Sequence, residues 1–101
     1  MNELLEWLAG GDLTSDGASD KVASFVLANP FLINDLVDGF KVQDDVVRGR
    51  AADALEKVAR SLPEPVSEHL PTLLNSARED PVPMVRWHLA MLLGHVSMIA
   101  E

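Results

Sequence analysis

The side chains between residues 12 and 20 have the spacing of oxygen ligands in a calcium-binding loop of the EF-hand type. The oxygen ligands at loop positions 1, 3, 5 and 9 and the glycine at position 6 are matched by Asp12, Thr14, Asp16, Asp20 and Gly17. The position of the bidentate glutamate that closes such a site holds Ala23. A polar turn rich in capping residues explains the same pattern, so we expect no metal ion and no cofactor here.

Histidine is the second kind of candidate ligand. His88 and His95 lie seven residues apart on one expected helix, about 10.5 Å along its axis, whereas zinc-binding pairs on a helix are four apart. His69 lies on the neighbouring helix, but no pattern requires it as a ligand. We interpret the histidines as surface or ion-paired residues. Because no Ser-His-Asp arrangement or phosphate-binding glycine loop is recognisable, we expect a non-enzymatic protein.

The charge distribution argues against nucleic-acid binding. The chain has 8 basic and 16 acidic side chains, a net charge of −8, and residues 1–45 hold nine of the acids and two of the bases. The nearest approach to a basic patch is formed by Arg48, Arg50, Lys57 and Arg60. Asp53 precedes Lys57 by four residues and Glu56 precedes Arg60 by four, the spacing of helical ion pairs. We therefore expect a solvated ion-pair face.

Length and composition indicate one small domain. The 101 residues are 48% apolar with few aromatics, which predicts an aliphatic core of packed helices. Cysteine is absent, the start of the chain is acidic rather than basic, and no apolar run approaches the roughly 18 residues that span a bilayer. We expect a cytoplasmic protein without membrane contact.

Capping residues, glycines and prolines predict six helices and no strand. The first is capped by Asn2 and the second by Ser19 or Asp20, with a loop at 10–18 between them. Pro30 opens the third, which Phe31, Leu32, Leu36 and Phe40 fill. Asp44 or Asp45 caps the fourth, which ends before Pro63 and Pro65. The fifth covers 66–78, with a break or bend at Pro71, and the sixth begins at Pro83.

The chain repeats itself. Segments 47–58 and 85–96 match after 38 residues at the pairs Val47/Val85, Arg48/Arg86, Ala52/Ala90, Leu55/Leu93 and Val58/Val96. Upstream, 33–37 matches 70–74 after 37 residues, so each unit is a pair of helices that stacks on its neighbour. We expect helices 30–39 and 64–79 in one layer and helices 44–61 and 83–98 in the other. Ala52 and Ala90 should lie at close helix contacts.

An apolar helix followed by one that opens with Asp and Val-Arg resembles the HEAT repeat, an armadillo-type helical repeat. The resemblance implies an all-α, right-handed α-α superhelix of about three helix pairs: a degenerate unit or cap at 1–29 and repeats at 30–61 and 64–98. It also implies a role as a scaffold for protein interaction. Its ladder between repeats would be formed by Asp44, Asp45, Arg48, Asp80 and Arg86.

A stripe on the last helix departs from the repeat. Polar residues of the earlier helix are replaced by apolar ones at the pairs Gly49/Trp87, Asp53/Met91, Glu56/Gly94 and Arg60/Met98. The stripe is either internal core, packed on this chain or on further repeats, or a docking face for another protein or a second copy, with Trp87, Met91 and Met98 as contacts. We expect a protein-interaction module. The alternatives are a nucleic-acid-associated helical-repeat protein and the regulatory subunit of a larger enzyme.

Overall fold

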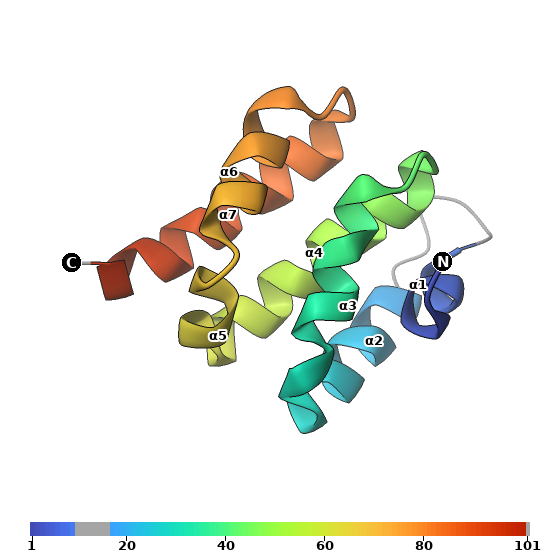
Figure 1. Cartoon of the computed structure of the whole chain (residues 1–101), viewed down its shortest axis with the longest axis horizontal. Helices are drawn as coiled ribbons and strands as arrows, with labels where there is room; N and C mark the ends of the chain where they lie inside the picture. Colours follow the sequence, from blue (N-terminus) through green and yellow to red (C-terminus); the bar gives the residue numbers. More distant parts are fainter. Residues whose placement is uncertain (10–16, 101) are drawn as a thin grey trace.

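The computed structural model shows a chain of helices joined by short connections (Figure 1). The structure describes the backbone of residues 1–9 and 17–100 and the side chains of residues 1–9 and 18–96. The α-helices are α1 (Glu3–Leu8), α2 (Gly17–Ala28), α3 (Ile33–Val37), α4 (Asp45–Ser61), α5 (Pro63–Ser67), α6 (Leu70–Glu79) and α7 (Pro83–Ala100). Two 3-10 segments, η1 (Pro30–Leu32) and η2 (Asp38–Lys41), flank α3. These ranges contain no strand, which confirms the predicted all-α class.

Two of the predicted caps are confirmed. The Oδ1 atom of Asn2 accepts a hydrogen bond of 3.0 Å from the backbone N–H of Leu5 at the start of α1. Asp44, rather than Asp45, caps α4, with its Oδ1 atom accepting from the backbone N–H groups of Val46 at 2.8 Å and Val47 at 3.3 Å. Each cap satisfies backbone donors that have no partner within the helix.

The second helix begins earlier than predicted. Because α2 starts at Gly17, Ser19 and Asp20 lie inside it and do not cap it. The Ser19 side chain is fully buried, and its hydroxyl donates to the backbone carbonyl of Arg50 in α4 at 3.5 Å. Ser19 therefore serves the packing of α2 on α4. The expected calcium-loop positions Asp12 to Asp16 lie outside the described residues.

The predicted fifth helix is two helices. Pro63, expected only to end α4, occupies the first position of α5, and His69 separates α5 from α6. Pro71 lies in the first turn of α6, where an N–H group would have no helical partner in any case. The same prolines thus end one helix and begin the next.

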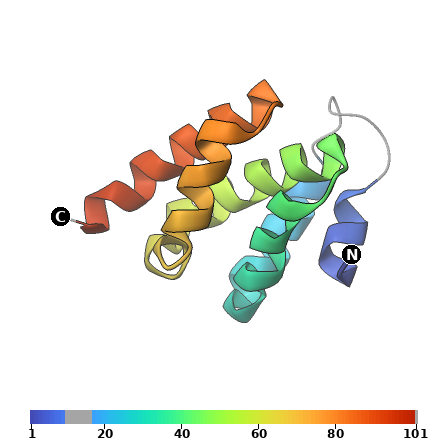
Figure 2. The same cartoon turned by 45° about the horizontal axis from the view of Figure 1, so that its top comes forward.

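The helices pack in consecutive pairs. α1 contacts α2, α3 contacts α4, and α6 contacts α7, while α4 lies between α2 and α7 (Figure 1). α4 and α7 run side by side in the same direction and form one layer. α3 and α6 form a second layer, which packs on one side of the first (Figure 2). The N-terminal helix and the C-terminal end of α7 lie at opposite ends of a body of 39 × 30 × 21 Å. α4 is therefore the central helix.

The described core is aliphatic, as predicted. Its largest fully buried apolar side chains are Leu5, Leu8, Leu36, Leu55, Leu73, Leu89 and Leu92. Phe40 is the one aromatic among the buried hydrophobic residues that the structure describes. Phe31 was expected to fill the third helix, but 74% of its surface is exposed, because it lies in η1 at the edge of the helix pair.

The prediction that Ala52 and Ala90 both lie at close helix contacts is wrong for Ala90. Ala52 is fully buried in α4, whereas Ala90, the equivalent residue of α7, is exposed. The difference follows from the position of each helix in its layer. α4 lies between α2 and α7, whereas α7 has α4 on one side and no described helix on the opposite side.

Candidate functional site

Arg48 connects the α3–α4 pair to the α6–α7 pair. Its Nε atom donates to Oδ2 of Asp80 at 2.8 Å, and its guanidinium also donates to Asp45, one helical turn earlier. The same side chain donates to the backbone carbonyls of Val42 at 3.0 Å and Gln43 at 2.8 Å. One buried guanidinium therefore holds the start of α4, the connection before it and the connection between α6 and α7.

The other ladder candidates lie around Asp80. The Oδ1 atom of Asp80 accepts from the backbone N–H of Val82 at 2.9 Å, just before α7. Arg86 donates to the backbone carbonyl of Asp80 at 2.7 Å, not to its carboxylate. Asp44 acts as the cap of α4 and forms no ion pair with a described residue. Arg48, Asp45 and Asp80 are thus joined side chain to side chain, whereas Asp44 and Arg86 act through the backbone.

Burial and charge oppose each other at Arg48. Burial alone would lower its pKa, but hydrogen bonds and charge from Asp80 and Asp45 outweigh that effect and raise it. The guanidinium is fully charged, and its hydrogen bonds are of the strong, charge-assisted kind. A pocket of about 430 Å³ lies beside this group, lined by residues of 40–48 and 75–81, but Arg48 and Asp45 in its lining already pair with each other.

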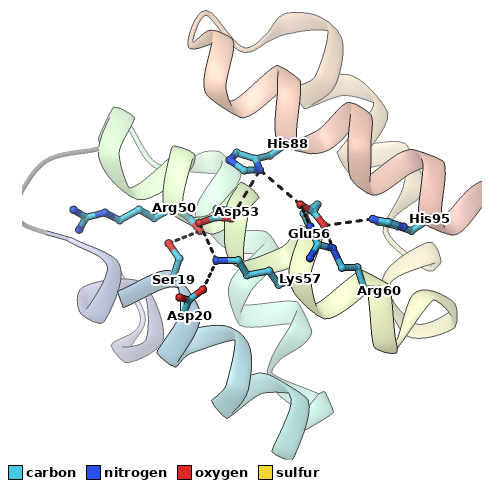
Figure 3. Close-up of polar contacts among 9 residues, drawn as sticks. All are labelled: Ser19, Asp20, Arg50, Asp53, Glu56, Lys57, Arg60, His88 and His95. Atoms are coloured by element: carbon cyan, nitrogen blue, oxygen red, sulfur yellow. Dashed lines mark hydrogen bonds and ion pairs between the residues drawn. The ribbon is translucent and has the colours of Figure 1, made fainter. Parts of the chain in front are cut away.

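A second polar cluster lies between α4 and α7 (Figure 3). Its members from α2, α4 and α7 are Ser19, Asp20, Arg50, Asp53, Glu56, Lys57, Arg60, His88 and His95. The expected pairs form: Lys57 lies 3.4 Å from Asp53, and Arg60 donates to Glu56 at 2.9 Å. The expectation of a solvated face holds for Arg60, whose side chain is 53% exposed, but it is wrong for Glu56, which α7 covers and leaves only 1% exposed. Arg48 and Arg50 are buried as well.

The two histidines of α7 face the carboxylates of α4. Nε2 of His95 lies 3.3 Å from Oε2 of Glu56, and Nδ1 of His88 lies 3.9 Å from Asp53 and 4.0 Å from Glu56 (Figure 3). His69 immediately precedes α6 and is not a member of this cluster. No three His, Cys, Asp or Glu side chains among the described residues are grouped to hold a metal ion. The histidines contribute polar contacts between the two helices.

Lys57 extends the cluster to α2. It forms ion pairs with Asp20 of α2 and with Asp53 of its own helix. Burial would lower its pKa, but the hydrogen bond to Asp20 and the charges of Asp53 and Asp20 raise it. Asp20, a candidate calcium ligand by its spacing, is thus engaged by a cation of the same chain. α2, α4 and α7 are linked through a single row of polar side chains.

The alignment of α4 with α7 indicates which face of α7 carries the apolar stripe. Asp53 and Glu56 are on the face of α4 that contacts α7, and their equivalents in α7 are Met91 and Gly94. The stripe therefore occupies the face on which a further helix would lie if the stacking continued. Trp87 is 60% exposed on this face, and Met91 is half-buried. The side chain of Met98 lies outside the described residues.

A pair of exposed aromatics on α1 and α2 was not predicted from the sequence. Trp7 of α1 and Phe25 of α2 make an edge-to-face contact with ring centroids 5.3 Å apart, and they are 48% and 43% exposed. The available signal was periodicity: Leu4, Leu5 and Leu8 form the buried face of α1, and Trp7 lies off it. No sequence spacing links Trp7 to Phe25, because the contact depends on how α1 packs on α2.

No family model, curated protein sequence or solved structure matches the chain. None of the helices within residues 1–9 and 17–100 has the length and apolar character needed to cross a membrane.

Proposed function

We propose that the chain is a short HEAT-like helical-repeat module that binds another protein, or a second copy of itself, through the outer face of α7. This surface, the α7 face, is defined by Trp87 and Met91, and the repeat spacing adds Met98 as an expected member. The observation that carries the proposal is the exposure of Trp87 at a position where the preceding repeat packs against its neighbour. Large exposed aromatics beside methionine are enriched at protein interfaces.

Three observations support the helical-repeat character of the proposed module. Consecutive helices pack in pairs, the second helices of the pairs lie in a row, and Arg48 joins one unit to the next through Asp80. A helix of such a row presents the same face to its successor each time. The α7 face is therefore suited to a partner that docks a helix along it.

The polar surface does not favour the nucleic-acid alternative. Arg48 and Arg50 are buried, and Lys57 and Arg60 are paired with carboxylates of α2 and α4. The cations closest together in sequence are thus withheld from phosphate groups, which a nucleic-acid-binding surface must neutralise.

The experiment compares the two exposed tryptophans. Trp87→Ala and Trp7→Ala are matched changes at exposed tryptophans of α7 and α1, and each variant is used beside the wild type for sedimentation and for affinity purification. We expect either a dimer or a co-purifying protein that Trp87→Ala abolishes and Trp7→Ala retains. The co-purifying protein is then made separately and titrated against both variants.

Two results would refute the proposal. One is a monomeric chain whose partners, in direct titration, bind Trp87→Ala as tightly as wild type. The other is a loss of binding that tracks only with unfolding, which circular dichroism of the Trp87→Ala variant would reveal.

A further inference from the structure

The exposed aromatic pair of α1 and α2 borders a pocket of its own. The pocket measures about 220 Å³ and is formed by four elements, with a lining of Glu3, Leu4, Trp7, Phe25, Leu32 and Asp35. Pockets for drug-sized molecules measure about 300–1,000 Å³, so this one suits a single bulky side chain better than a cofactor. A shallow apolar surface that shares Phe25 continues from it along α2.

The walls of the pocket are held in place. Leu4 is buried in the core, and the side-chain amide of Asn2 donates to the backbone carbonyl of Asp35 at 3.0 Å, which ties the start of α1 to α3. The edge-to-face contact fixes the Trp7 ring against Phe25. A partner would therefore meet a preformed apolar site, which reduces the entropy lost on binding.

Carboxylates border the apolar floor. Glu3 and Asp35 line the pocket, and neither forms an ion pair with any residue that the structure describes. The acids of the chain are concentrated in this half, where residues 1–45 include nine of the 16. An aromatic floor with an acidic rim is complementary to an apolar side chain flanked by Lys or Arg, since those cations pair with the rim and stack on the Trp7 ring.

We propose that this pocket, the Trp7 pocket, binds a segment of a partner protein in which one bulky apolar side chain is flanked by basic residues. A second copy of this chain is a poor occupant, because six of its eight basic side chains are engaged internally: Lys41, Arg48, Arg50, Lys57, Arg60 and Arg86. An anionic membrane surface is repelled by the same carboxylates. The Trp7 pocket is separate from the α7 face, because no residue of α7 lines it.

The test selects peptides from a random library on the full chain and measures the affinity of the enriched peptides. We expect a consensus with a bulky apolar residue beside Lys or Arg. Trp7→Ala and the charge reversal Asp35→Lys should each weaken binding by at least about tenfold, the effect typical of a hot-spot residue. Leu74→Ala, a control at an exposed apolar residue of α6 outside both surfaces, should leave the affinity unchanged. Added salt should weaken binding of the wild type more than of Asp35→Lys.

Several outcomes would overturn the proposal. These are the absence of enriched peptides, a consensus without basic residues, and binding that Trp7→Ala and Asp35→Lys leave intact. A dimer that Trp7→Ala dissociates would assign the pocket to a second copy, and capture by anionic vesicles would assign it to a membrane. Because Asp35→Lys changes a partly exposed side chain, it reports on the rim even if Trp7→Ala unfolds α1.

Discussion

α4 and α7 have matching sequences and opposite surroundings. α4 buries twelve residues, including Arg48, Arg50, Asp53 and Glu56. Among the described side chains of α7, only Val85, His88, Leu89, Leu92 and Val96 are buried. Val47 and Val58 of α4 and their equivalents in α7 are buried alike, whereas Ala90 and the polar positions of the repeat depend on what lies beside the helix. Position in the stack, rather than the local sequence, decides which polar groups must find partners within the protein.

The two helices also present different side chains on their equivalent faces. α4 presents carboxylates to the histidines of α7, and α7 presents Trp87 where α4 has a glycine. A buried carboxylate requires a polar neighbour, so the α4 face fits one particular helix. The equivalent positions of α7 carry no carboxylate, so the partner proposed for the α7 face would need to supply only apolar surface.

The largest expected difference concerns the equivalent arginines. Arg48→Met should lower the free energy of unfolding by about 3–5 kcal/mol, because it leaves the Asp80 carboxylate buried without its cation. Arg86→Met should cost about 0.5–1.5 kcal/mol, since Arg86 donates to a carbonyl and leaves no buried charge. Urea denaturation measures both. Adding Asp80→Leu to Arg48→Met should recover part of the loss, and equal costs for the two arginines would contradict the comparison.

The equivalent alanines test burial without charge. Ala52→Leu should overpack a filled contact and cost about 1–3 kcal/mol, whereas Ala90→Leu should stay within about 0.5 kcal/mol of wild type because Ala90 is exposed. Thermal denaturation of the pair gives the difference directly. A large loss in Ala90→Leu would mean that another body covers this side of α7, and dilution would then reduce the loss if that body is a second copy.

Two glycines should respond with opposite signs. A Cβ atom at Gly94 of α7 meets nothing within 4 Å, so Gly94→Ala should stabilise the helix by about 0.5–1 kcal/mol. At Gly39 of η2 a Cβ would lie 2.9 Å from both the Cβ of Ala51 and a methyl of Leu5. Gly39→Ala should therefore destabilise the protein by about 1–3 kcal/mol. Melting temperatures that move in the same direction would show that one of these surroundings is misassigned.

The smallest effect is a dependence on alkaline pH. The pKa of Lys57 is raised above 10.5 in the folded state, so its ion pairs stabilise the protein fully below that value and lose the contribution as pH rises through the raised pKa. Lys57→Gln should therefore be less stable than wild type near neutrality by about 1 kcal/mol or less, and the two should converge in strongly alkaline solution. Melting curves across that range measure the gap, and a gap that widens with pH would contradict the assignment.

The sequence was sufficient where the physical cause is local. Capping by Asn2 and Asp44 and the apolar positions of α4 depend on a few neighbouring residues, and these predictions are confirmed. The all-α class follows from the same periodicity. The extent of α2 was misjudged because Ser19 has two suitable uses, as a cap and as a buried donor, and only the packing of α2 on α4 selects between them.

The site was harder to predict because its contacts join distant segments. The i,i+4 pairs Asp53–Lys57 and Glu56–Arg60 are readable from spacing, but their burial depends on where α7 lies. The meeting of Trp7 and Phe25 likewise requires the angle between α1 and α2. Periodicity identifies which side of a helix is apolar. It does not predict which element packs against the other sides of that helix.

The one-sided packing of α7 has a consequence for amide hydrogen exchange. Opening α7 exposes its contacts with α4 and α6, whereas opening α4 breaks contacts with both neighbouring units, so backbone amides of α7 should exchange by local opening and those of α4 only on global unfolding. A partner bound to α7 adds its own binding free energy to the closed form. Slowed exchange confined to α7 would then report occupancy, and α7 would become more protected as the concentration of the proposed partner rises above its dissociation constant.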